Sequence, residues 1–221
     1  MALILNIETS TKSTSVALAK NGKLLALREE HEVVSHATKL SPFIEEALKD
    51  VNLNLSDLDA IAISNGPGSY TGLRIGLSTA KGLCYALDIP LITLSGLESM
   101  AQFLKTKYTK KFKLYVSIMN SRKNELYLSS MDSSLRIVHK PSAIKIDDYF
   151  LQEYVNEDII IAGSGWEKLD GNIEHTKMTF IEGVNFSAKN MIDPTFNLFK
   201  QSLFADLAYS EPNYLKPFIG T

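Results

Sequence analysis

A glycine-rich loop between a buried strand and a helix is the feature that most constrains the fold of this chain. Residues 60–64 form a short continuous apolar run, which predicts a buried strand, and Gly66-Pro67-Gly68 follow it closely. Gly72 and Gly76 come next, at the start of a predicted helix that extends to Leu87. Glycines in such a loop let the backbone approach another group closely before the chain enters the helix.

The loop matches neither of the common glycine-rich nucleotide-binding patterns. A Walker A loop has four residues between its glycines and then Gly-Lys-Ser/Thr, and a dinucleotide fingerprint has Gly-x-Gly-x-x-Gly; the loop fits neither. We therefore favour a tight structural turn over anion binding. In the anion-binding alternative the end of the first strand and the loop would face a nucleotide phosphate, through Glu8, Thr9, Ser10, Gly66, Pro67 and Gly68.

The surrounding pattern predicts an α/β fold. Asn21-Gly22 predicts a type I′ hairpin turn between two early strands. An amphipathic helix follows; we favour a start near His36, with Pro42 inside it, over a start at Ser41-Pro42. Strands are predicted at 3–9, 16–20, 23–30, 60–64 and 91–95. The first hundred residues are thus expected to follow the order β-β-β-α-β-α-β-α.

A lysine-rich stretch at 106–113 marks the expected boundary between an N-terminal unit, 1–107, and a smaller unit, 108–221. Strands are predicted at 113–119, 124–130, 135–140 and 158–162, with a helix at 146–155. Two short helices separated at Pro194 are predicted within 187–207, and they can pack back on the first unit. The alternation predicts mixed sheets flanked by helices.

Composition narrows the class of protein. The chain is 45% hydrophobic and 22% charged, as in ordinary globular domains, and its net charge is -2. A nucleic-acid contact is therefore expected to be weak or shared with a partner. A single cysteine, Cys84, predicts the reducing cytosol, and the absence of a long apolar run predicts no membrane partner. We expect a cytoplasmic protein.

No catalytic set emerges from the sequence. The four histidines do not form a His-x-x-x-His pair, Gly-x-Ser-x-Gly is absent, and Cys84 lies on an apolar helix face typical of an inert thiol. The same helix carries small residues at every fourth position, which permit close packing of another element. Packing within the unit is one interpretation of this ridge, and a subunit interface is the other, which we favour: Gly72, Gly76, Ala80 and Cys84.

Several segments together resemble the TsaB family, also called YeaZ. They are Ile4-Leu5-Asn6-Ile7-Glu8-Thr9-Ser10, Ser15-Val16-Ala17-Leu18, Ser35-His36-Ala37, Gly66 to Gly76, Ala80 to Leu83 and Glu211-Pro212-Asn213-Tyr214-Leu215-Lys216. The resemblance covers the whole chain, and its glycine-rich run is the most specific part. Two positions depart from the family pattern: Glu8 stands where Asp is common, and Asn120-Ser121-Arg122 where Asp-Ala-Arg is usual.

The resemblance implies a two-lobe actin-like, ribonuclease-H-like fold with mixed five-stranded sheets. It implies a non-catalytic scaffold that activates a TsaD-like subunit in making N6-threonylcarbamoyladenosine in tRNA. A TsaE-like ATPase joins the pair, tRNA binds through the complex, and the chain alone forms a homodimer. The chain needs no cofactor or metal of its own; ATP or ADP would bind at the partner interface, and the metal belongs to the TsaD-like partner.

The family's dimer surface is formed by the first two helices. The interface residues that this implies here are Leu40, Phe43, Ile44, Ala47, Gly72, Leu73, Gly76, Leu77, Ala80, Leu83 and Cys84. Two rival functions remain at this stage. One is a metal-independent peptidase or small-molecule kinase on the same fold, and the other is a nucleotide-sensing module.

Overall fold

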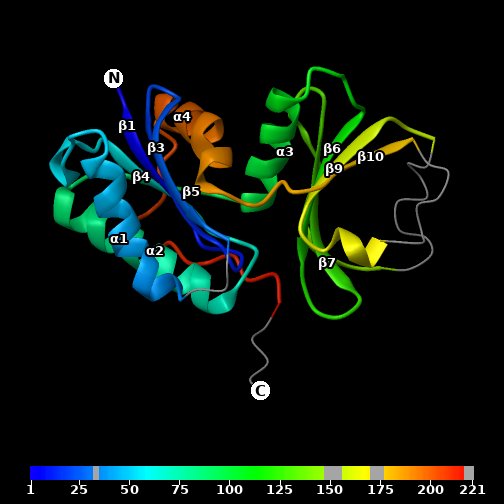
Figure 1. The fold of residues 1–221 in the computed structure, drawn as a ribbon, viewed down its shortest axis with the longest axis horizontal. Coiled ribbons are helices and arrows are strands. Elements are labelled where there is room, and N and C mark those ends of the chain that lie inside the picture. The colour runs from blue at the N-terminus through cyan, green and yellow to red at the C-terminus, as the bar shows by residue number, and fades with distance from the viewer. Residues whose placement is uncertain (32–34, 147–155, 170–176, 217–221) are drawn as a thin grey trace. The chain divides into compact units, whose positions relative to one another are not determined.

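The computed structural model describes residues 1–31, 35–146, 156–169 and 177–216 (Figure 1). The chain divides into two compact units. The first comprises Met1–Gly96 and Phe186–Tyr214, and the second comprises Leu97–Asn185 and Leu215–Thr221. The elements, in chain order, are β1 (Leu3–Glu8), β2 (Thr14–Lys20), β3 (Lys23–Glu30), α1 (His36–Lys49), η1 (Leu55–Asp57), β4 (Ala60–Ser64), α2 (Tyr70–Leu87), β5 (Leu91–Leu94), α3 (Gly96–Lys107), β6 (Leu114–Asn120), β7 (Glu125–Asp132), β8 (Ile137–Lys145), β9 (Ile159–Gly163), η3 (Trp166–Leu169), β10 (Met178–Ile181), η4 (Ala188–Met191) and α4 (Ile192–Lys200).

The first unit is built on a mixed sheet in the order β3-β2-β1-β4-β5. The central strand β1 runs antiparallel to β2 and parallel to β4. Successive side chains of β1 point to opposite faces, because a strand has a period of two residues. Leu5 and Ile7 enter the core beneath α1 and α2, whereas Ile4 joins the core beneath α4. Apolar burial on both faces explains why β1 and β4 are nearly continuous apolar runs.

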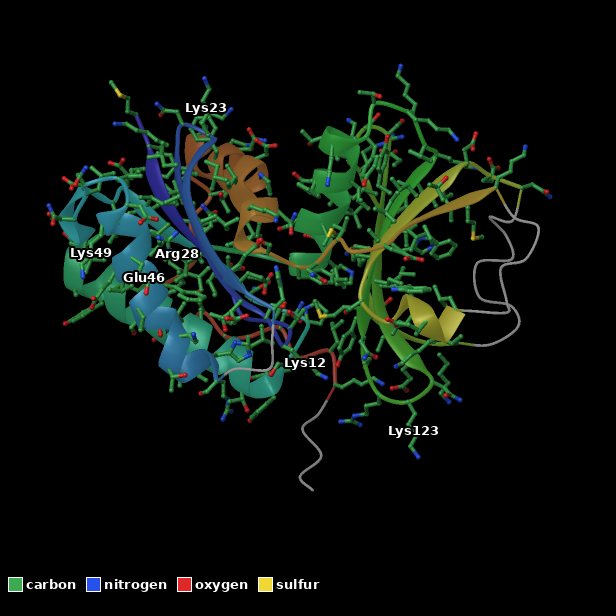
Figure 2. The ribbon with its side chains drawn as sticks, in the orientation of Figure 1. Lys12, Lys23, Arg28, Glu46, Lys49 and Lys123 are labelled. Carbon is green, nitrogen blue, oxygen red and sulfur yellow. The ribbon has the colours of Figure 1, made fainter. Side chains whose placement is uncertain are left out.

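Helices cover both faces of this sheet, with α1 and α2 on one face and η4 and α4 on the other (Figure 1). The Thr195 hydroxyl of α4 donates to the buried Asn6 Oδ1 at 2.7 Å, so the one amide on the apolar face of β1 is paired. On the opposite face, Arg28 of β3 and Glu46 of α1 point toward one another (Figure 2), with 3.1 Å between Nε and Oε2. These contacts hold the helices on a sheet whose strands carry the candidate site.

The second unit has a mixed sheet in the order β10-β9-β6-β7-β8. Its core is formed by the apolar residues of β6, β7 and β9, with Val116 and Ile161 among those fully buried. Helix α3 belongs to this unit, and the Ser117 hydroxyl of β6 donates to the Leu97 carbonyl at 2.6 Å. The predicted boundary at 107/108 assigns α3 to the first unit instead. The difference arises because the lysine-rich stretch lies within the second unit, which begins at Leu97.

Most of the predicted elements are present, including the α1 helix with Pro42 inside it and the Asn21-Gly22 turn with both φ angles positive. Strand β10 was not predicted; its four residues are only half-buried, so its apolar signal is short. The two C-terminal helical segments meet at Met191 and not at Pro194, which lies in the first turn of α4, where proline is tolerated. The helix predicted at 146–155 lies almost wholly outside the described residues.

Two glycines of α2 give a matched test of this packing. A Cβ added at Gly76 would lie 2.2 Å from Thr9 Oγ1, whereas one at Gly82 meets nothing within 4 Å. We expect Gly76→Ala to lower the free energy of unfolding by about 1–3 kcal/mol through overpacking. Gly82→Ala should raise it by about 0.5–1 kcal/mol, because alanine has the higher helix propensity. Urea unfolding of both variants tests this, and equal effects would contradict the packing described.

Candidate functional site

Glu8 is the buried carboxylate at the carboxyl end of β1. Its side chain is 1% exposed, and its Oε1 accepts a hydrogen bond from the Ser10 backbone N–H at 2.6 Å. Burial raises the pKa of Glu8 above its usual range, and the hydrogen bond from the Ser10 backbone N–H offsets this only in part. Ser64 ends the parallel neighbour β4, so the two strand ends share one polar cluster.

The glycine-rich loop presses directly on the loop that follows β1. The Ser69 N–H donates to the Ser10 carbonyl at 2.7 Å, and a Cβ added at Gly68 would lie 2.2 Å from that same oxygen. One turn later, the Thr9 hydroxyl donates to the Gly72 carbonyl at 2.8 Å. The glycines thus serve the close approach of two backbone segments, as the structural-turn interpretation expects.

The residues that could bind a phosphate in the anion-binding interpretation do lie together. They form a buried cluster at the end of β1, which we call the strand-end cluster, and hydrogen bonds within the chain connect several of its groups. Glu8, Thr9 and Ser10 are each at most 1% exposed, and Gly66 and Pro67 are also buried. Among these groups, the Ser10 N–H and the Thr9 hydroxyl already have partners within the chain. These hydrogen bonds and close approaches join β1 to α2, whereas the buried hydroxyls of Ser10 and Ser64 have no hydrogen-bond partner among the described residues.

His36 closes the same cluster from the start of α1. Its Nδ1 lies 2.7 Å from the Thr14 hydroxyl, and a Cβ added at Gly72 would approach its Nε2 at 3.0 Å. Burial lowers the pKa of His36, partly opposed by a backbone hydrogen bond at Thr11. The imidazole is therefore neutral at neutral pH and acts as a packing and hydrogen-bonding group between α1 and α2.

A C-terminal strap, residues 205–214, runs along α2 and covers the glycine-rich loop. Lys81 Nζ donates to the carbonyls of Ala208 and Ser210 at 2.9 and 3.2 Å. The Asn213 N–H donates to the Asn65 carbonyl at 2.7 Å, which brings the Asn213 carbonyl within 2.8 Å of a Cβ built on Gly66. The strap thereby occupies the side of the loop that faces away from β1.

An aromatic and cationic cluster fixes the end of the strap. The Tyr70 and Tyr214 rings are stacked with centroids 4.8 Å apart, and the Arg74 guanidinium lies 4.2 Å from the Tyr70 centroid. Arg74 Nε also donates to the Tyr214 hydroxyl at 3.0 Å. Tyr70, Lys81, Asn213 and Tyr214 were not among the predicted site residues; their only sequence signal was membership in the motifs that carry the family resemblance.

The predicted interface residues lie inside the first unit. The four from α1, Leu40, Phe43, Ile44 and Ala47, are buried in the core beneath the helices. The small-residue ridge of α2 faces the sheet, since Gly72 and Gly76 contact Thr9 and Ala80 and Cys84 are 0% exposed. Leu77 is buried and Leu83 partly buried on the same core, and Leu73 is 1% exposed. Of the predicted interface residues, Leu83 alone is not classed as buried.

The exposed residues of α1 and α2 form a second surface, which we call the α1/α2 face. We define it by ten of the exposed residues: Ala37, Thr38, Ser41, Pro42, Glu45, Thr71, Ser78, Gly82, Tyr85 and Ala86. The charged residues Glu46, Lys49 and Arg74 are also exposed on these helices. The two helices are in contact within the first unit. Tyr85 is 84% exposed, and the space around Gly82 is open. A mostly small-residue helical face with one exposed aromatic anchor is suited to helix packing.

The Cys84 thiol is buried and unreactive, as its place on an apolar helix face predicts. Burial raises the pKa of the Cys84 thiol to about 11, which keeps it protonated at neutral pH. Within the described residues, no three His, Cys, Asp or Glu side chains are grouped so that they could hold a metal ion. No helix among those residues is long and apolar enough to cross a membrane.

Comparison with known proteins places these features in a family. Residues 30–215 match the family described as TsaD: tRNA N6-adenosine threonylcarbamoyltransferase. The chain is 35% identical over 133 residues to the tRNA threonylcarbamoyladenosine biosynthesis protein TsaB of Haemophilus influenzae, covering 58% of this chain and 53% of that protein. It is 31% identical over 174 residues to TsaB of Buchnera aphidicola (subsp. Schizaphis graminum), covering 76% of this chain and 80% of that protein.

The solved structures agree on the fold. YeaZ from Pseudomonas aeruginosa superimposes with a TM-score of 0.81 at 24% identity, covering 97% of this chain and all of that one. The two five-stranded sheets with their helices are the two-lobe actin-like ATPase fold that the sequence resemblance implies. The predicted fold class is thereby confirmed.

The buried Glu8 carboxyl makes stability depend on pH. Its pKa in the folded state is raised above 4.5, so its full contribution to stability is present below that pH and is lost as the pH rises. We expect the free energy of unfolding of Glu8→Gln, relative to the unsubstituted protein, to increase from pH 4.5 to neutral pH. Urea unfolding over this range is the measurement, with the exposed Glu211→Gln as the charge-matched control. A relative stability that falls with rising pH would contradict the burial of Glu8.

Cys84 reports whether the small-residue ridge is internal. Because the thiol is buried and its pKa is about 11, we expect no reaction with a thiol-specific disulfide reagent in the native protein at neutral pH. Unfolding in guanidinium chloride should release one reactive thiol per chain, since Cys84 is the only cysteine. Rapid modification without denaturant would show that the ridge faces solvent.

Proposed function

This chain belongs to the TsaB family of tRNA threonylcarbamoyladenosine biosynthesis proteins, and we propose that within it the chain binds and activates a TsaD-like transferase without catalysing the transfer itself. The state of the strand-end cluster is the observation that carries this proposal. Glu8, Thr9 and Ser10 are buried, hydrogen bonds within the chain engage the Glu8 carboxylate, the Thr9 hydroxyl and the Ser10 main chain, and Asn213 of the strap binds the adjoining loop. These residues hold elements of the fold together, and their burial keeps a substrate from reaching them.

The α1/α2 face is the surface that we propose for the partner. It combines exposed small residues on two adjoining helices with Tyr85 as an anchor, which favours packing against two helices of another subunit. The same face would serve a homodimer of the chain alone, so homodimer and heterodimer would compete for it. The buried residues predicted from the sequence would then act indirectly, by holding α1 and α2 in place.

The remaining components of the proposal follow the family. The chain supplies no cofactor and no metal; ATP or ADP binds at the interface with the TsaD-like partner, and the metal is held by that partner. A TsaE-like ATPase joins the pair. The sequence supports this division of roles, because the chain lacks the His-x-x-x-His pair that would hold a metal.

A single substitution tests the proposed partner surface without changing the core. Gly82→Arg places a long cation on the α1/α2 face, at a position where an added Cβ meets nothing within 4 Å. We expect its unfolding temperature to stay close to that of the unsubstituted protein and its co-purification with the TsaD-like partner to be lost. Gly82→Ala is the control and should bind normally. Normal binding by Gly82→Arg would move the partner surface elsewhere.

The activity itself is tested with unmodified tRNA. Threonylcarbamoyl transfer is measured with the TsaD-like partner, its substrates and the TsaE-like ATPase present, first with and then without this chain, and also with this chain in place of the partner. Transfer only when both subunits are present is the expected result. Transfer by this chain without the TsaD-like subunit, or no effect of the chain on that subunit, would overturn the proposal.

A further inference from the structure

A lysine segment, Lys105–Lys113, joins α3 to β6 in the second unit and is drawn in green in Figure 1. Five of its nine residues are lysines, although the chain as a whole carries a net charge of -2. None of these lysines belongs to the strand-end cluster or to the α1/α2 face. The local surplus of positive charge therefore has no role in the function proposed so far.

Two of the five lysines have acidic partners. Lys110 Nζ lies 2.9 Å from Asp158 Oδ1, and Lys113 Nζ lies 2.5 Å from Glu157 Oε1. Within the parts of the chain that the structure describes, Lys105, Lys107 and Lys111 form no ion pair. Among the described residues, the end of α3 and the connection after it thus carry three lysines without an acidic partner.

The aromatic residues of the segment are buried or half-buried, and their rings contact lysine side chains. Phe112 is 4% exposed and Tyr108 is half-buried, so neither offers an apolar anchor to a partner. Lys107 Nζ lies 5.3 Å from the Phe103 ring centroid and 5.8 Å from that of Tyr108, which holds its charge at the surface. What the segment presents to solvent is ammonium groups and the hydroxyl of the exposed Thr109.

This chemistry fits a phosphate backbone better than a protein surface. Protein interfaces have an apolar centre from which lysine is depleted, whereas nucleic-acid interfaces are polar and strongly positive. Lysine and threonine are among the residues that contact phosphate oxygens without reading base sequence. Lysine also acts as a flexible point charge, which tolerates the irregular path of a folded RNA.

We propose that Lys105, Lys107 and Lys111 contact the phosphate backbone of the tRNA that the complex modifies. This inference rests on the proposed function, because it takes the tRNA as the RNA present. Three phosphate contacts give weak and salt-sensitive binding, which suits a surface that adds to the contacts of a partner subunit. The chain would then take part in holding the substrate as well as in activating the transferase.

The test measures binding of a fluorescent, unmodified tRNA transcript to the chain alone and to its complex with the TsaD-like partner, between 50 and 200 mM salt. Each phosphate contact contributes about 0.7–0.9 to the slope of log affinity against log salt. Replacing Lys105, Lys107 and Lys111 together by glutamine should therefore weaken binding and make the slope shallower by about 2. The corresponding triple arginine variant should keep the slope of the unsubstituted protein.

A matched control removes the same charge from the first unit. Lys20, Lys23 and Lys200 are exposed there, and their triple glutamine variant should bind tRNA with an unchanged slope. An equal loss in this control, an unchanged slope in the Lys105/Lys107/Lys111 variant, or no tRNA binding by the unsubstituted chain and complex would each overturn the inference. A variant that keeps tRNA binding but no longer co-purifies with the partner would assign the segment to a protein contact instead.

The two proposals fail in different ways. If the chain does not activate the TsaD-like partner, the proposed function fails whatever the tRNA affinity. If activation is normal at saturating tRNA but the salt slope is unchanged by the triple glutamine variant, only the tRNA contact fails. Unfolding temperatures of all variants, expected to match that of the unsubstituted protein, show whether the half-buried Lys105 and the exposed lysines were replaced without disturbing the fold.

Discussion

The approach of two backbone segments, one after β1 and one before α2, is the constraint on which the first unit depends. Ser10 and Gly68 meet so closely that a single added carbon at Gly68 would lie 2.2 Å from the Ser10 carbonyl oxygen. Gly72 and Gly76 continue this approach along α2. Because the backbone of α2 packs directly on the loop that follows β1, the orientation of α2 on the sheet is fixed. Helix α1 contacts α2 and contributes the rest of the α1/α2 face.

The same contacts occupy the strand ends of the first sheet. In the actin-like arrangement the ends of β1 and β4 lie where a ligand would meet the sheet. Here Glu8 is buried, and the Thr9 hydroxyl donates to the Gly72 carbonyl of α2. The Ser10 carbonyl accepts from the Ser69 N–H, and Asn213 of the strap lies against Gly66. These polar groups stabilise the contact between β1 and α2. The contacts that we propose with other molecules therefore use the α1/α2 face and the lysine segment.

Sequence patterns predicted the periodic elements well and the orientation of their faces less well. The period-two and period-3.6 signals located β1 to β5, α1 and α2, because each buries apolar residues at regular spacing. A small residue at every fourth position shows that something packs closely, but it does not show whether a sheet or a partner does so; in α2 it is the sheet. The strap was beyond prediction, since Lys81 binds main-chain carbonyls that any sequence carries.

The division of the chain between the units has a consequence for its synthesis. One face of the first sheet, with Ile4, Ala62 and Ile92, is covered by Met191 and residues of α4, which follow the whole of the second unit in the chain. At a ribosomal rate of about 5–20 residues per second, the interval between β5 and α4 lasts roughly 5–20 s. Throughout that interval the nascent chain exposes a complete apolar sheet face, which makes it a substrate for chaperones until α4 emerges.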